Sequence, residues 1–339
     1  MQAKLKFVFA VGLLSAACAP AAFAADDGIL EQAAKASWRH DIAQIATPAE
    51  GCFKATYPSV LWEPTACHQL APRAHTVPRQ IVFGQEQTTG NGVDYTLDST
   101  NVISKAVGSF PTFSGVTSEQ GVNVPFGSGE SNGIIGPNEY SLQMNTSFNS
   151  TTAACNGHSG CVVWQQFIYA PDYEVQGQGA VFIQDWLIGY GGRRCPSGFG
   201  SDGAGDCYKN SAATSMADIP GTALGSVTLT GTAVTGGNDT TVVTYNGNAY
   251  STSQKDSTLD IASVWKEVEY NVVGNAGGSQ AQFNSGSTIG VNIAVTNGST
   301  AAPTCQANNG STGETNNLNL GSCTASAGST PSVSFTESN

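Results

Sequence analysis

The sequence predicts an all-β fold, an antiparallel two-sheet β-sandwich of the concanavalin or jelly-roll type with a short helical N-terminal module. Only 11% of the 339 residues are charged, and 40 are glycine. Glycine, asparagine and serine supply the backbone dihedral angles that tight turns need. From residue 86 onward, short segments with strand-like alternation are separated by such turns, without an internal repeat or a βαβ pattern. This pattern favours antiparallel sheets packed face to face.

The first 24 residues have the pattern of a secretory signal peptide. Two lysines precede an apolar core over residues 7–17, and an Ala-Phe-Ala cleavage signal ends at Ala24. We therefore expect a secreted or periplasmic protein. Acylation at Cys18 is the alternative, but Ser15 stands where a lipoprotein signal has leucine. Beyond residue 24 no apolar run is long enough to cross a bilayer, so no membrane contact is expected.

Residues 25–85 differ from the rest of the chain. Asp27–Ile45 has helical spacing with an apolar stripe, and Pro48 and Gly51 end it. The stripe consists of Ile29, Ala33, Ala36, Trp38, Ile42 and Ile45. A cysteine-closed segment and a proline-containing linker follow. This part is interpreted as an accessory module or a propeptide, or as a segment packed on the main domain, and residues 86–339 as the sandwich.

The negative charge of the chain narrows the classes of partner that it could bind. The formal charge is −12, and removal of a leader with two lysines and no acids leaves −14. Such a surface repels nucleic acid and anionic lipid. No cofactor is expected, and the chain is expected to be a monomer.

The cysteines beyond the leader predict local disulfides. Eight remain, an even number, as is typical of exported proteins. Zinc is the alternative, but the chain has no CxxC pair and only four histidines. Neighbouring cysteines are expected to pair as Cys52–Cys67, Cys155–Cys161, Cys195–Cys207 and Cys305–Cys323.

Two long strands joined by a loop are predicted at Val162–Tyr169 and Ala180–Tyr190. Alternation in the second strand places Val181, Ile183 and Leu187 on one face and Phe182, Gln184 and Trp186 on the other. Trp164 and Gln166 share a face of the first strand.

Two further strands extend this polar face. In residues 262–273, Ser263, Trp265, Glu267, Glu269 and Asn271 lie on one face, and the other face is apolar except for Lys266. In residues 139–148, Gln143 and Asn145 alternate with apolar residues. Two carboxylates that lie two residues apart in a strand point the same way, about 7 Å apart. Together these residues indicate one sheet face with amides, indoles and two acids, which is suited to ligand binding.

Two of these segments resemble motifs of the glutamic peptidases (eqolisins), which are secreted two-sheet β-sandwiches. Val181-Phe182-Ile183-Gln184, preceded by Trp164, is similar to the strand that carries the catalytic glutamine. Val268-Glu269-Tyr270-Asn271-Val272-Val273 is similar to the glutamate strand over its first half. The family's catalytic glutamate falls on Val273 in this chain. The resemblance covers roughly residues 139–295.

The resemblance implies a peptidase that works in acid. Gln184 would donate a hydrogen bond to the developing oxyanion, and Glu269 or Glu267 would be the general base toward a water. Repulsion between neighbouring acids raises one pKa, which favours an acidic working pH. The substrate would be a polypeptide, bound by Trp164, Gln166, Trp186, Trp265, Gln143 and Asn271.

Other hypotheses compete with the peptidase. The same face is suited to glycan binding, with sugar rings stacked on Trp164, Trp186 and Trp265. A structural extracellular domain is a third possibility.

Two other motifs do not indicate a site. Gly157-His158-Ser159-Gly160 lacks the spacing and strand–turn–helix context of a serine nucleophile. Residues 202–206 contain two aspartates but not the full set of calcium ligands, and no metal is expected.

Overall fold

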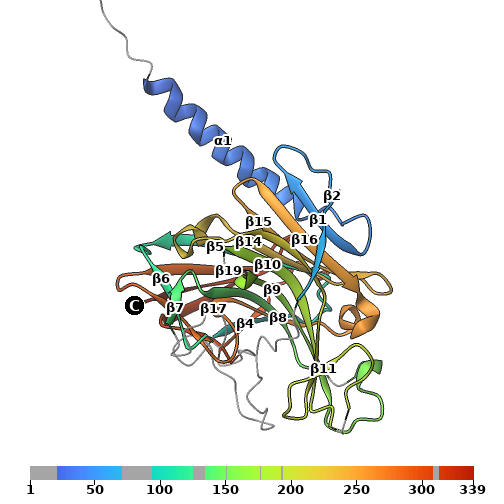
Figure 1. The fold of residues 1–339 in the computed structure, drawn as a ribbon. Coiled ribbons are helices and arrows are strands. Elements are labelled where there is room, and N and C mark those ends of the chain that lie inside the picture. Colours follow the sequence, from blue (N-terminus) through green and yellow to red (C-terminus); the bar gives the residue numbers. More distant parts are fainter. Residues whose placement is uncertain are drawn as a thin grey trace, which may run out of the picture.

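The protein is a β-sandwich built from antiparallel sheets, and one long helix in the described residues lies at its N-terminal side (Figure 1). The computed structural model describes all residues except 1–20, 71–93, 125–133, 150, 176, 192–193 and 308–312. Most of the predicted signal peptide, the end of the predicted linker and the start of the predicted sandwich lie outside the described residues. The predicted fold class, an all-β sandwich with a short helical segment, is confirmed.

Two large sheets form the sandwich. The nine-stranded sheet has the order β2 (Glu63–Pro64), β1 (Gly51–Thr56), β16 (Asn248–Lys255), β15 (Asn238–Tyr245), β14 (Thr228–Thr232), β5 (Lys105–Ser114), β19 (Thr288–Thr296), β23 (Ser332–Ser338), β22 (Asn319–Ser326). The ten-stranded sheet has the order β11 (Gly200–Ser201), β12 (Cys207–Asn210), β10 (Gln178–Ile188), β9 (Val162–Val175), β8 (Tyr140–Thr146), β17 (Glu267–Gly274), β4 (Tyr95–Asp98), β20 (Thr304–Ala307).

Shorter strands complete the fold. β13 (Ala212–Ala217) pairs with β10, and β3 (Cys67–Gln69) pairs with β13. A four-stranded sheet has the order β21 (Thr315–Asn316), β18 (Gln280–Phe283), β6 (Glu119–Val122), β7 (Ile134–Pro137). Every described strand pair is antiparallel except β18 with β21.

The main core lies between the two large sheets. Phe110 of β5 packs on Tyr270 of β17, with ring centroids 5.1 Å apart. The sheets approach so closely that a Cβ at Gly108 would lie 2.4 Å from the Tyr270 ring. Overpacking of this kind forces side chains and backbone to shift, so glycine is required at this position.

The helix α1 (Ala21–Ile42) starts earlier than the sequence predicts, and only its C-terminal end packs on the sandwich. Trp38 and Ile42 are buried against Ala55, Val242 and Ala249 of the nine-stranded sheet. The predicted apolar stripe is wrong at its N-terminal end, because Ile29 remains 65% exposed. As Figure 1 shows, this end of α1 projects away from the sheets.

The segment that follows the helix belongs to both sheets. β1 pairs along its full length with β16, and β3 pairs with β13. Residues 51–69 therefore do not form a separate module, because the backbone hydrogen bonds of β1 and β3 are made with the sandwich.

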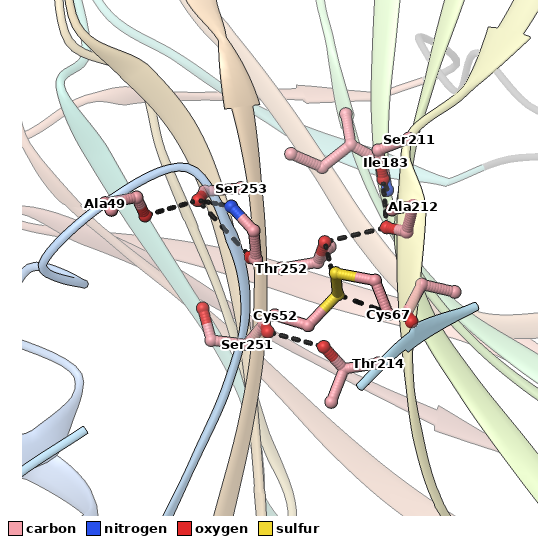
Figure 2. Close-up of a disulfide and its surroundings, with 12 residues drawn as sticks. Ala49, Cys52, Cys67, Ile183, Ser211, Ala212, Thr214, Ser251, Thr252 and Ser253 are labelled. Atoms are coloured by element: carbon pink, nitrogen blue, oxygen red, sulfur yellow. Dashed lines mark hydrogen bonds between the residues drawn. A yellow bond between two sulfur atoms is a disulfide. The ribbon is translucent and has the colours of Figure 1, made fainter. Parts of the chain in front are cut away.

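A junction between the two sheets lies at this edge, which we call the edge seam (Figure 2). It consists of the Cys52–Cys67 disulfide and two threonine hydrogen bonds. The Thr252 hydroxyl donates to the Ala212 carbonyl at 2.7 Å, and the Thr214 hydroxyl donates to the Ser251 carbonyl at 2.6 Å. The seam joins β1 and β16 of one sheet to β3 and β13 of the other.

All four predicted disulfides are confirmed. They join Cys52–Cys67, Cys155–Cys161, Cys195–Cys207 and Cys305–Cys323. Disulfides persist in oxidising compartments, so the four bonds indicate that the protein resides in one.

No helix in the described part of the chain is long and apolar enough to cross a membrane.

Candidate functional site

Four of the polar residues predicted to share a sheet face, Gln184, Gln166, Asn145 and Glu269, form a row across the ten-stranded sheet, and Asn210 and Thr96 extend it at either end. Strand register places them side by side on its outer face, the face turned away from the nine-stranded sheet. Neighbouring residues in the row lie one strand apart, about 4.8 Å. In order, this outer polar row consists of Asn210, Gln184, Gln166, Asn145, Glu269 and Thr96.

Hydrogen bonds link the amides of the row to one another and to a tryptophan. The Trp186 indole Nε1 donates to Oε1 of both Gln166 and Gln184, at 2.9 Å each. Gln184 Nε2 donates to Asn210 Oδ1 at 2.6 Å, and Gln166 Nε2 donates to Gln143 Oε1 at 2.9 Å. These bonds join Asn210, Gln184, Trp186, Gln166 and Gln143 into one network, which holds their side chains in defined orientations.

Glu269 is the carboxylate of the outer polar row. Its Oε2 accepts a hydrogen bond of 3.0 Å from Nδ2 of Asn145, the residue opposite it on β8. Both side chains are buried, at 3% and 1% exposure. A carboxylate and an amide are therefore adjacent on a dry sheet face, where electrostatic interactions are stronger than in water.

Aromatic rings form a second row next to the polar one. Tyr208, Trp186 and Trp164 lie opposite one another on β12, β10 and β9. Phe148 continues the row, with its ring 5.4 Å from that of Trp164. Trp164 Nε1 has no hydrogen-bond partner among the residues that the structure describes, unlike Trp186 Nε1.

Gln184 and Glu269 are not adjacent. They lie in the same row but three strands apart, about 14 Å between their Cα atoms from the usual strand spacing. Gln166 and Asn145 stand between them, and the Gln184 amide group is directed to Asn210 on the far side. Val273 lies opposite Ser141, two rows away from Glu269 on the same face. The structure therefore brings Glu269 together with Asn145 rather than with Gln184.

Glu267 lies next to Glu269 on the same face but has a different partner. It stands opposite Asp98 on β4, and the two side chains are hydrogen-bonded. Burial raises the pKa of Asp98, while hydrogen bonds from Thr96 and Glu267 lower it. Glu267 is partly exposed, so this acid pair is at the margin of the site.

The predicted face position of Trp265 is wrong. Residues 261–263 form a 3-10 helix, and β17 begins only at Glu267, so alternation does not extend back to Trp265. Its ring packs 5.6 Å from Phe167 in the core between the sheets. Trp265 therefore cannot act as a stacking platform on the outer face.

Asn271 lies near the edge of the site and contacts a separate group of acids. Its Nδ2 donates to Glu337 Oε1 at 2.8 Å and to Asp94 Oδ2 at 3.2 Å. Burial raises the pKa of Glu337 to about 7, against the lowering effect of hydrogen bonds from Asn271 and Asn316. Asn271 thus holds buried acids in place.

The two other sequence motifs, at residues 157–160 and 202–206, take part in local packing and turn hydrogen bonds. His158 stacks on Tyr190 at 3.6 Å, and its Nδ1 lies 2.7 Å from the Tyr190 carbonyl oxygen. Asp202 Oδ1 accepts hydrogen bonds from the backbone amides of Ala204 and Asp206, which close the turn. Across the described ranges no three His, Cys, Asp or Glu side chains are grouped so that they could hold a metal ion.

The sequence did not predict two members of the outer polar row, Asn210 and Thr96, or the acid cluster behind it. Asn210 sits in the four-residue strand β12, which is too short for alternation to give a signal. Asp185 is flanked by Gln184 and Trp186, and its position in an apolar strand could have marked it as a buried acid.

No protein-family model, curated protein or solved structure matches this chain.

Proposed function

We propose that this chain is an exported hydrolase that cleaves polypeptides in acid, with its reaction centre at Glu269 in the outer polar row. The observation that carries the proposal is the 3.0 Å contact between the Glu269 carboxylate and the Asn145 amide, one strand from the buried amide network that contains Gln166. Export rests on the leader-like first 24 residues, together with the four disulfides.

The arrangement supports general-base hydrolysis. The Glu269 carboxylate would take a proton from a water, whose oxygen forms a bond to the carbonyl carbon of the scissile peptide. The second N–H of the Asn145 amide would donate to the oxyanion that develops on that carbonyl, and Gln166 is one strand further along the row. Collapse of the intermediate breaks the C–N bond, and the proton passes from Glu269 to the leaving amine.

This assignment changes the roles that the sequence suggests. Gln184 holds Trp186 and Asn210 in place and supports the network, while Asn145 takes the part of oxyanion donor. The remaining neighbours Gln143, Gln166, Trp164 and Trp186 would contact the bound chain. Because all of these side chains are nearly or fully buried, the face must open before a substrate can bind.

The test is digestion of a denatured protein between pH 2 and 5, before and after incubation of the enzyme at pH 3. Glu269→Gln and Asn145→Ala are expected to lower kcat by about 10²–10³, the usual effect of losing a base or an oxyanion donor. The control is Glu50→Gln, an exposed acid that should leave the rate unchanged. Wild-type rates in both Glu269→Gln and Asn145→Ala would contradict the proposal, and loss of activity only in Glu267→Gln would move the base to Glu267.

Glycan binding is the second candidate, favoured by the row of Tyr208, Trp186, Trp164 and Phe148. Sugar rings stack on aromatic surfaces, and neighbouring amides bind hydroxyl groups. Trp164 and Trp186 are fully buried, so glycan binding also requires the face to open. Titration with oligosaccharides should quench tryptophan fluorescence, and Tyr208→Ala should weaken this response. An unchanged signal over a broad set of glycans would count against this candidate.

A further inference from the structure

Three aspartates are buried together between the two large sheets. Asp185 of β10 and Asp239 of β15 are fully buried, and Asp256, in a 3-10 helix at Asp256–Thr258, is 2% exposed. None of them belongs to the outer polar row, because Asp185 points to the opposite face of β10 from Gln184. They form an acid cluster in the core.

Two glutamines hold this cluster across the gap between the sheets. Gln165 Nε2 of β9 donates to Asp185 Oδ1 at 3.0 Å and to Asp239 Oδ2 at 2.8 Å. Gln254 Nε2 of β16 donates to both oxygens of Asp185, at 2.9 and 2.7 Å. Gln254 of the nine-stranded sheet thus binds Asp185 of the ten-stranded sheet, and Gln165 of the ten-stranded sheet binds Asp239 of the nine-stranded sheet.

The cluster has more acceptors than donors. In the described part of the chain, three of its buried oxygens have no donor: Asp239 Oδ1, Gln165 Oε1 and Gln254 Oε1. Asp239 also shares a side-chain hydrogen bond with Asp256, which two carboxylates can make only if one carries a proton. Added protons would supply the missing donors.

The surrounding elements bring little positive charge. β9 and β16 present the neutral Gln165 and Gln254, and the 3-10 helix at Ile261–Ser263 presents the Ala262 amide, which donates to Asp256 Oδ1 at 2.9 Å. Lys209, opposite Asp185 on β12, is the nearby cation and is partly exposed. A buried acid group without a close cationic partner is costly to ionise.

We propose that Asp185, Asp239 and Asp256 are a proton-binding cluster that holds the two sheets together in acid and weakens their association as the pH rises toward neutral. The cluster lies behind the outer face and does not depend on whether that face cleaves peptides. It makes the fold itself sensitive to pH.

The direction of the pKa changes supports the proposal. Burial raises the pKa of Asp185 from 3.8 to about 6, although hydrogen bonds from Gln165 and Gln254 and the charge of Lys209 lower it. Burial, followed by the charges of Asp256 and Asp185, raises the pKa of Asp239 well above its ordinary value, against a hydrogen bond from Gln165. The folded chain therefore keeps protons that the unfolded chain releases, so stability is complete below about pH 4 and falls as the pH rises through the folded-state pKa values.

The test is urea unfolding of the full chain from pH 3 to 8. For wild type, Asp185 alone should lower the ratio of folded to unfolded protein by about a hundredfold between pH 4 and 7. Asp239→Asn supplies amide donors without charge and should make this fall shallower and raise the urea midpoint at pH 7. The exposed Asp41→Asn is the control and should retain the wild-type profile.

Other buried acids contribute to the same profile. Burial raises the pKa of Glu119 to about 8 and that of Glu337 to about 7, so Asp239→Asn should keep part of the fall. Wild-type stability that is flat or rises from pH 4 to 7 would overturn the proposal. So would an Asp239→Asn profile as steep as that of wild type.

A measurement on the wild type covers the case in which Asp239→Asn does not fold. Carboxyl-carbon NMR of the native protein, with the aspartate signals assigned, should show Asp185 or Asp239 still protonated at pH 5.5, whereas titration of both near pH 4 would overturn the cluster. Glu269 lies on the other face of the ten-stranded sheet, so Glu269→Gln should leave the titration of Asp185 and Asp239 unchanged. Failure of the peptidase proposal and failure of this one are therefore separable.

Discussion

At the scale of single residues, Trp164 and Trp186 form a natural pair for comparison. Both indoles are fully buried on the same face, opposite each other on adjacent strands. Only the Trp186 Nε1 donates to the glutamines of the outer polar row, at 2.9 Å to each. The two positions thus differ in hydrogen bonding more than in packing.

Replacing each tryptophan by phenylalanine isolates this difference. Both changes remove similar volume, but Trp186→Phe also removes two hydrogen bonds, so we expect it to cost about 1–3 kcal/mol more than Trp164→Phe. The free energy of unfolding in urea at pH 4 measures both variants. Equal losses, or a larger loss for Trp164→Phe, would show that the network contributes nothing to stability.

Alternation along the chain correctly separated the two faces of β9 and β10. It placed Gln166, Gln184 and Trp186 together because successive side chains of a strand point to opposite faces. It could not show where each amide is directed, since that depends on neighbours from distant parts of the chain. Asn145 meets Glu269 across 124 residues of sequence, and this contact moves the candidate reaction centre away from Gln184.

At the scale of elements, the edge seam connects the two sheets through one disulfide and two hydroxyl groups (Figure 2). Cys52–Cys67 closes a loop with a sequence separation of 15 residues, and Cys155–Cys161 closes one of only six. The first bond joins strands of different sheets, whereas the second stays within the turn before β9. Their removal should therefore have different effects.

We expect the double substitution of Cys52 and Cys67 by alanine to cost about 3 kcal/mol, and that of Cys155 and Cys161 about 2 kcal/mol, from loop-closure entropy. Loss of the seam adds to the first value, because the Thr252 and Thr214 hydrogen bonds depend on the same alignment of strands. Thermal unfolding at pH 4 compares the two variants. A larger effect from the Cys155–Cys161 pair would contradict the role assigned to the seam.

Patterns of residues close in the sequence predicted some elements well and others poorly. The β9–β10 hairpin and the neighbouring-cysteine pairs were predictable because each depends on residues close in sequence. The start of β17 was not, because the 3-10 turn before it directs Trp265 into the core beside Phe167. The acid cluster was also beyond prediction, since Asp185 and Asp239 meet only when the two sheets pack.

At the scale of the whole molecule, the sandwich requires its N-terminal strands. β1 lies between β2 and β16 in the nine-stranded sheet, and β3 borders β13 in the other. The boundary predicted at residue 85 therefore separates strands that share one core. A chain without residues 51–69 would leave β16 as an open edge, which is prone to pair with other molecules.

A comparison of residues 86–339 with residues 25–339 tests this dependence. The shorter chain loses β1, β3 and the Cys52–Cys67 bond, so we expect it to aggregate or to unfold without a cooperative transition. The longer chain should be monodisperse and unfold in one step, as measured by size-exclusion chromatography and near-UV circular dichroism during heating. A third chain, residues 51–339, lacks only the helix and the turn after it. Removal of the buried Trp38 and Ile42 should cost it about 3–6 kcal/mol. If residues 86–339 instead formed a cooperative monomer with native near-UV signals, β1 and β3 would be dispensable, and the sandwich would be a separate domain after all.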